Sequence, residues 1–283
     1  MSTTEFETGE KNTWCPGCGN FGILNGVKQA LQQLGVPRDQ VVEVSGIGCH
    51  GKITDYVNVN GMHVVHGRVL PAATALKLVN HSLTVIGHAG DGDAFGIGLG
   101  HFAHAARRNV PISYVIHDNM VYGLTTGQTS PTSQKGFKTK TSPRGTIEFP
   151  VNPLTQALTG NASFVARGYA GELKHLIELF KEAFTWPGFA LVDVLQPCVT
   201  FNRVNTYDFY RKSVYKLEDS NHDASDFTSA YSKALEWGDK IPIGVFFKQK
   251  RETYLDAFPA LRDGPLARKE LKPDIRKLID EFR

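Results

Sequence analysis

Short apolar runs alternate along this chain with longer stretches in which apolar residues recur at helical spacing. The runs read as buried strands and cover residues 41–45, 83–88, 112–118, 162–169 and 189–195. The stretches with helical spacing cover residues 21–34, 69–79, 97–108 and 171–184. Apolar strands separated by helices are typical of a parallel sheet covered on both faces. The predicted fold is therefore α/β, with a doubly wound, mostly parallel sheet.

Two regions interrupt this alternation. Residues 119–161 are polar and show little periodicity, which predicts a long functional or mobile loop. From residue 202 the chain becomes more charged, with one apolar, strand-like run at 241–247. We therefore expect a cofactor-binding domain over residues 1–201 and a largely exposed C-terminal extension over residues 202–283. Such an arm is either a solvated surface extension or a segment that wraps a partner subunit.

Composition narrows the class of protein. The chain has 283 residues, 41% of them hydrophobic, and a net charge of +3, so it can bury a core but gives no reason to expect binding to nucleic acid or membrane. No apolar run approaches the roughly 18 residues of a membrane span, and the N-terminus does not resemble a signal peptide. The expected location is cytoplasmic, where the four cysteines are better explained as metal ligands or free thiols than as disulfides.

A glycine-rich segment with two carboxylates follows the strand expected at 83–88. Residues 90–93 read G-D-G-D, a pattern that differs from the dinucleotide motif but can present backbone amides to a diphosphate. A carboxylate beside phosphates requires a hard cation between them. The next strand ends just before Asn119, so Asp91, Asn119 and the carbonyl of Val121 are candidate Mg²⁺ ligands.

The cysteines lie at the ends of predicted elements. Cys15 and Cys18 flank a Pro-Gly turn before the first helix, Cys49 follows the strand at 41–45, and Cys198 follows the strand at 189–195. Cys49 or Cys198 alone would read as a core cysteine, but a Cys-x-x-Cys turn is poor core material. Four converging thiolates hold either zinc or a 4Fe–4S cluster, and their spacing does not distinguish the two.

These motifs together resemble one family, the β subunits of 2-oxoacid:ferredoxin oxidoreductases. The matching segments are W-C-P-G-C-G-N-F-G from Trp14, G-I-G-C-H-G-K at 46–52, H-G-R at 66–68, G-D-G-D at 90–93 and D-N-x-V-Y-G-L-T-x-G-Q at 118–128. The resemblance extends from about Trp14 to Leu217, and the later part of the chain matches less distinctly.

The resemblance implies three cofactors and the residues that hold them. A 4Fe–4S cluster would be bound by Cys15, Cys18, Cys49 and Cys198. A Mg²⁺ ion would be bound by Asp91, Asn119 and the Val121 carbonyl. Thiamine diphosphate would contact Ile47, Gly48, Cys49, His50, His66, Gly92, Asp93, Gly123 and Leu124.

The resemblance also implies a reaction, in which a 2-oxoacid loses CO₂ and coenzyme A takes the acyl group. The electrons would pass one at a time through the cluster to ferredoxin. The turn V-Y-G-L-T is similar to that of 2-oxoglutarate and broad-specificity members, so we expect 2-oxoglutarate, with pyruvate or other 2-oxoacids as the alternative. Lys52, Arg68 or the partner subunit would bind its distal carboxylate. Several relatives carry Lys at the position where this chain has Thr126. Any role of that lysine in a substrate lid or in coenzyme A binding is therefore in doubt for this chain.

Thiamine chemistry also needs a glutamate beside the aminopyrimidine ring. The candidates here are poor, since Glu43 lies inside an apolar strand and Glu148 in the polar loop. The resemblance implies that a partner α subunit supplies the glutamate. Two alternatives remain: a non-redox thiamine-diphosphate lyase or synthase, which leaves the cysteines unexplained, and an iron–sulfur or zinc scaffold, which leaves Asp91 and Asn119 unexplained.

Overall fold

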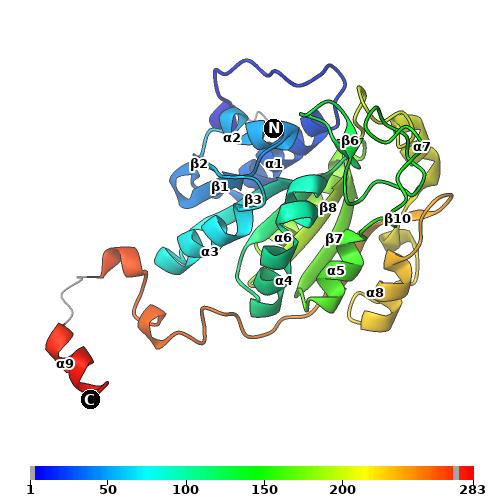
Figure 1. Ribbon diagram of the computed structural model, residues 1–283. Coiled ribbons are helices and arrows are strands. Elements are labelled where there is room, and N and C mark those ends of the chain that lie inside the picture. The colour runs from blue at the N-terminus through cyan, green and yellow to red at the C-terminus, as the bar shows by residue number, and fades with distance from the viewer. Residues whose placement is uncertain (1–3, 270–273) are drawn as a thin grey trace.

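A computed structural model describes residues 4–269 and 274–283, and in this part of the chain the main sheet has eight strands (Figure 1). In spatial order they are β2 (Asn60–His63), β1 (Val41–Ser45), β3 (Thr84–Gly90), β4 (Ser113–Asp118), β8 (Ala190–Leu195), β7 (Phe164–Tyr169), β10 (Ile241–Lys248) and β9 (Val214–Lys216). Strands β2 to β7 in this order are mutually parallel. Only the far edge reverses, because β10 runs antiparallel to β7, with β9 parallel to β10. The predicted fold class is confirmed.

Helices cover both faces of the sheet. One face packs against α1 (Asn20–Leu34) and α6 (Leu173–Phe184), and the other against α3 (Val69–Val79), α4 (Leu99–Arg108), α5 (Pro153–Thr159) and α8 (Phe227–Ala234). Neighbouring strand residues enter opposite cores: Val85 faces α3 and α4, whereas Ile86 faces α1 and α6. Both positions are apolar because both faces are covered, which is why the strands read as continuous apolar runs.

Most element bounds agree with the sequence, with three corrections. The run H-V-V-H at 63–66 predicts a further strand, but the strand found there lies earlier in the chain, since β2 covers Asn60–His63. The helix expected from residue 97 is preceded by a π-helical turn, η4 (Asp93–Ile97). The helical conformation therefore begins inside the glycine-rich segment. The polar stretch 119–161 is not loop throughout, because it contains the hairpin β5 (Val121–Tyr122) and β6 (Gln128–Thr129) as well as α5.

The C-terminal region is more integrated than its charge suggested. The expectation of a largely exposed arm is wrong for residues 202–248, because β9 and β10 extend the main sheet and α7 (Tyr207–Ser213) and α8 contribute buried side chains. Beyond residue 250 the described chain is mostly exposed and ends in α9 (Ile275–Asp280), which lies away from the sheet in Figure 1. That this region contacts a partner subunit stays a prediction.

The parallel order brings several chemically important segments to one edge. The carboxyl ends of β1, β3, β4 and β8 lead directly into residues 46–50, 91–93, 119–125 and 196–198. Ligands of open α/β sheets bind outside these strand ends. Among the described residues, no helix has the length and apolar character needed to cross a membrane.

Candidate functional site

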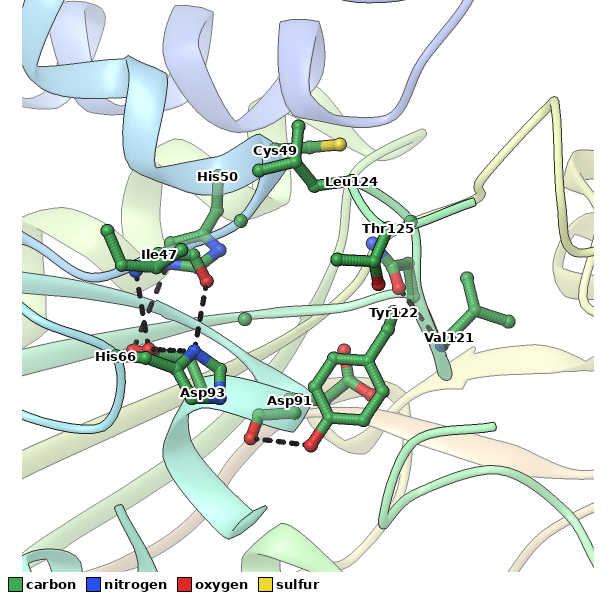
Figure 2. Close-up of a pocket in the computed structure, with 15 residues that line it drawn as sticks. Ile47, Cys49, His50, His66, Asp91, Asp93, Val121, Tyr122, Leu124 and Thr125 are labelled. Carbon is green, nitrogen blue, oxygen red and sulfur yellow. Dashed lines mark hydrogen bonds and ion pairs between the residues drawn. The ribbon is translucent and has the colours of Figure 1, made fainter. Parts of the chain in front are cut away.

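A pocket lies at the carboxyl ends of β1, β3 and β4 (Figure 2). It is lined by Ile47, Gly48, Cys49, His50, His66, Gly90, Asp91, Gly92, Asp93, Asn119, Val121, Tyr122, Gly123, Leu124 and Thr125. The structure thus gathers in one pocket all the residues expected to contact thiamine diphosphate and all three expected Mg²⁺ ligands. In the sequence they are up to 77 positions apart, from Ile47 to Leu124.

Asp91 is a buried carboxylate at the centre of this pocket. Its side chain is 1% exposed, and burial raises its pKa to about 6. The Thr132 hydroxyl lies 2.8 Å from Asp91 Oδ2, and its contacts extend to Asp118 Oδ1 at 2.9 Å. A buried carboxylate is stabilised in its ionised form by a nearby cation. Asp91 therefore has the chemistry of a hard-cation ligand.

Asn119 follows β4 and faces the same pocket as Asp91. Its Oδ1 accepts a hydrogen bond from the Val121 backbone N–H (3.1 Å), and its Nδ2 donates to Gln196 Oε1 (2.9 Å). An amide oxygen has two acceptor sites, so Oδ1 keeps one for a cation. Met120 and Thr126, with φ of 59° and 77°, hold the turn in the left-handed region that non-glycine residues rarely occupy.

Asp93 ties three segments together beside the pocket. Its Oδ1 accepts from the backbone N–H groups of Gly67 (2.7 Å) and Ile47 (3.3 Å) and lies 2.9 Å from His66 Nδ1. Figure 2 shows the His66 and Asp93 side chains turned toward each other. Its other oxygen, Oδ2, is buried without a hydrogen-bond partner and is 4.0 Å from His50 Nε2. Burial lowers the pKa of His50 to about 3, so His50 is neutral.

Two glycines give this pocket its shape. A Cβ on Gly92 would lie 2.1 Å from Tyr122 Cε1, because the tyrosine ring packs on the Gly92 backbone and its hydroxyl donates to Gly92 O at 3.2 Å. Gly48 has φ of 148°, and a Cβ there would lie 2.8 Å from the His50 ring. A side chain at either position would displace a residue of the pocket wall.

A second pocket, the cysteine pocket, has a volume of about 210 Å³ and is lined by all four cysteines. Its lining includes Cys15, Cys18, Cys49, Cys198, Trp14, Asn20, Lys52, Thr126, Gln196 and Phe201. Backbone contacts hold the cysteine segments together: the Gly19 N–H donates to Pro197 O at 3.0 Å, and Trp14 Nε1 donates to Cys49 O at 2.6 Å. The convergence of thiols from three segments, predicted from their positions at element ends, is present in the structure.

The cysteine thiols lie near enough to one another to interact electrostatically. Burial, together with the charges of Cys198, Cys49 and Cys15, raises the pKa of Cys18 to about 12. Within the described ranges no three His, Cys, Asp or Glu side chains close around a point as one metal ion requires. Tetrahedral zinc would need sulfurs only about 3.8 Å apart, from a Zn–S bond of about 2.3 Å.

The two pockets share a wall. Cys49, Asn119, Gly123 and Leu124 line both of them. A Cβ on Gly123 would lie 3.6 Å from Cys49 Sγ, so this segment passes directly over a candidate cluster ligand. The expected diphosphate and magnesium ligands are therefore adjacent to the thiols.

The sequence missed three residues of these sites. Tyr122 packs on Gly92, Thr132 contacts Asp91, and Gln196 connects the two pockets. Tyr122 lies inside the D-N-x-V-Y-G motif and could have been found there. Of the two cations proposed for a substrate carboxylate, Lys52 lines the cysteine pocket, whereas Arg68 is exposed and is not among the residues that line either pocket.

Comparison with known families agrees with this geometry. Residues 46–194 match the family model of the thiamine pyrophosphate enzyme C-terminal TPP-binding domain, and residues 198–263 match that of the C-terminal part of the pyruvate ferredoxin oxidoreductase β subunit. The first match spans the strand ends that form the first pocket and stops before Gln196. The second begins at Cys198.

Similar proteins cover about three quarters of the chain or more. The 2-oxoacid:ferredoxin oxidoreductase β subunit of Saccharolobus solfataricus is 44% identical over 97% of both chains. The 2-oxoglutarate oxidoreductase subunit KorB of Mycobacterium tuberculosis is 41% identical over 74% of this chain and 56% of its own.

A solved structure is similar as well. The 2-oxoglutarate:ferredoxin oxidoreductase from Magnetococcus marinus, determined with 2-oxoglutarate, coenzyme A and succinyl-CoA bound, matches with a TM-score of 0.92 at 39% identity, over 100% of this chain and 96% of that one. The chain belongs to the family of 2-oxoacid:ferredoxin oxidoreductase β subunits, and it contains the thiamine-diphosphate-binding domain of that enzyme.

Proposed function

We propose that this β subunit binds Mg²⁺–thiamine diphosphate in the first pocket and a 4Fe–4S cluster in the second. Asp91, Asn119 and the Val121 carbonyl would hold the magnesium ion, and Cys15, Cys18, Cys49 and Cys198 the cluster. The observation that carries the proposal is the wall that the two pockets share. When bound, the thiamine would activate the 2-oxoacid for loss of CO₂, and the cluster would accept electrons one at a time.

The residues around the pockets support separate tasks. Asp91 and the Asn119 oxygen offer hard ligands for a cation that neutralises a diphosphate. Tyr122 and Gly92 close one side of the pocket. Coenzyme A would collect the acyl group, and ferredoxin would accept the electrons. A β subunit implies an α partner.

Cofactor content tests this proposal. We expect the enzyme, co-expressed with its α subunit and purified without oxygen, to be brown, with about four iron atoms per β chain and bound thiamine diphosphate. Cys198→Ser should lose iron because one of four ligands is gone, whereas its thiamine content should persist. Iron and thiamine are measured by chemical assay and the cluster by its absorbance. Colourless protein with thiamine would favour a non-redox lyase or synthase, and metal without thiamine a scaffold.

We further propose 2-oxoglutarate as the preferred substrate, with other 2-oxoacids as the alternative. The supporting observations are the V-Y-G-L-T turn and relatives named for 2-oxoglutarate or for 2-oxoacids in general. A dicarboxylate needs a cation for its distal group. Lys52 is the lysine that lines the cysteine pocket, where its Nζ donates to Thr13 Oγ1 at 2.9 Å.

Steady-state kinetics on a panel of 2-oxoacids checks this preference. We expect kcat/KM to be highest for 2-oxoglutarate. If Lys52 binds the distal carboxylate, Lys52→Met should raise KM for 2-oxoglutarate about tenfold or more, since a charge-assisted hydrogen bond contributes about 1.5–3 kcal/mol. Pyruvate, which lacks that carboxylate, is the internal control. A clear preference of the unaltered enzyme for pyruvate would refute the assignment, and equal effects on both substrates would exclude Lys52 as the anchor.

A further inference from the structure

Gln196 lies between the two pockets and contacts both of the sites proposed above. It directly follows β8, is 1% exposed, and lines the cysteine pocket. Its backbone N–H donates to Asp118 O at 2.8 Å, which fixes it to the end of β4. Its side-chain oxygen Oε1 accepts from Asn119 Nδ2 at 2.9 Å, and its nitrogen Nε2 donates to Cys18 Sγ at 3.4 Å.

Two backbone groups fix the direction of the hydrogen bonds made by the side-chain amides of Gln196 and Asn119. At one end, Nε2 of Gln196 also lies 2.9 Å from Pro197 O, a carbonyl that can only accept. At the other end, Asn119 Oδ1 lies 3.1 Å from the Val121 backbone N–H, which can only donate. Neither amide can therefore be turned over without losing a bond. The oxygen of Asn119 must face the magnesium side, and an N–H of Gln196 must face the sulfur.

We propose that Gln196 is a positioning residue that serves both sites, orienting the Asn119 amide so that its oxygen meets Mg²⁺ and donating an N–H···S hydrogen bond to the Cys18 ligand of the cluster. This inference rests on the proposed cofactors. Hydrogen bonds to the sulfurs of an iron–sulfur cluster shift its reduction potential. A donor stabilises the more negative, reduced cluster and so raises the potential.

Two substitutions separate the two roles. Gln196→Glu keeps an oxygen that can accept from Asn119 Nδ2, but its carboxylate has no hydrogen to donate to Cys18. Gln196→Leu removes both contacts at similar volume and introduces no charge, so a change in potential there cannot come from an added carboxylate. Asn205→Ala is the control for loosened packing: Asn205 is 3% exposed, and its side-chain oxygen accepts from Asn202, one contact further from Asn119.

The test is an anaerobic redox titration of the αβ enzyme, followed by electron paramagnetic resonance, with thiamine diphosphate affinity measured by calorimetry in the presence of Mg²⁺. Loss of the N–H···S bond should shift the equilibrium between oxidised and reduced cluster about tenfold, which for one electron is a potential about 59 mV more negative. We expect this in both Gln196 variants and not in Asn205→Ala. Thiamine diphosphate should bind about tenfold more weakly to Gln196→Leu and about normally to Gln196→Glu.

Each other outcome overturns the inference. Unchanged potentials in both Gln196 variants would show that the Cys18 contact has no role in tuning. An equal shift in Asn205→Ala would mean that packing is responsible, and unchanged thiamine affinity in Gln196→Leu would remove the role toward Asn119. Absence of iron from the unaltered enzyme would instead refute the proposed cluster, and this inference with it. The iron content separates that failure from the others.

Discussion

We expect Asp91→Ala to abolish Mg²⁺-dependent binding of thiamine diphosphate while the chain still folds. The substitution deletes one of three proposed magnesium ligands, and the cation is what neutralises the diphosphate. Affinity should fall by more than the roughly 10–100-fold typical of losing a residue that only supports a metal ligand. Isothermal titration calorimetry of the αβ enzyme with thiamine diphosphate and Mg²⁺ measures the effect.

The fold should tolerate this change because Asp91 contributes little to stability without a cation. Its carboxylate is buried and its pKa is raised by that burial, so removing it also removes a desolvation penalty. Asp91→Asn, which retains an amide oxygen, should bind the cofactor with intermediate affinity. Thermal melting and iron content control for folding and for the cluster. Cofactor affinity equal to that of the unaltered enzyme would show that Asp91 is not a magnesium ligand.

We also expect the isolated β chain to be inactive and the α subunit to restore turnover. Thiamine catalysis needs a carboxyl group to act as a general acid–base on the aminopyrimidine ring, a contribution of about 10²–10⁴-fold in rate. Among the described residues that line the two pockets there is no glutamate. Glu43 is fully buried, 3.6 Å from His88 Nε2, and Glu148 is exposed. We infer that the partner supplies the carboxylate.

The measurement compares 2-oxoacid-dependent reduction of a dye or ferredoxin by the β chain alone, by the α chain alone and by the two mixed. The isolated β chain should give no turnover above background, and titration with α should restore it to saturation. Iron content of the isolated β chain must be checked, so that inactivity is not due to loss of the cluster. Full turnover by a cluster-loaded β chain would show that the glutamate is internal and that the partner argument is wrong.

The sequence predicted the layers and the position of the site better than the details of either. Parallel strands that are buried on both faces appear in the sequence as continuous apolar runs, which are easy to recognise. The helix α3 has the bounds that its apolar spacing predicted, Val69–Val79. The short strand β2 was misplaced because its side chains are exposed and carry no apolar signal. The prediction for residues 202–248 was wrong because the many charged residues of this region hide the fact that α8 buries Ala230 and Ala234 and that β10 is a mostly buried strand of the sheet.

Candidate ligands were predictable because their chemistry is distinctive, whereas the residues that orient them were not. A Cys-x-x-Cys turn before a helix, or a G-D-G-D segment at the end of a strand, has few other uses. Gln196 and Thr132 are common residue types, and their roles depend on strands that are far apart in sequence but adjacent in the sheet, such as β4 and β8. No local pattern encodes such a neighbour. The residues that orient the predicted ligands could therefore be identified only once the fold was known.

The contacts of Thr132 have a consequence for how much charge the magnesium site holds. A hydroxyl has one proton, yet Thr132 Oγ1 lies within hydrogen-bonding distance of both Asp91 and Asp118. If both carboxylates were ionised, one of these contacts would join two oxygens without a hydrogen. Burial raises the pKa of Asp91 to about 6, and burial and then the neighbouring Asp193 raise the pKa of Asp118 well above its usual range, which favours one proton held between these two acids. An incoming cation therefore meets a single negative charge from Asp91 and Asp118 together, although both residues are acids.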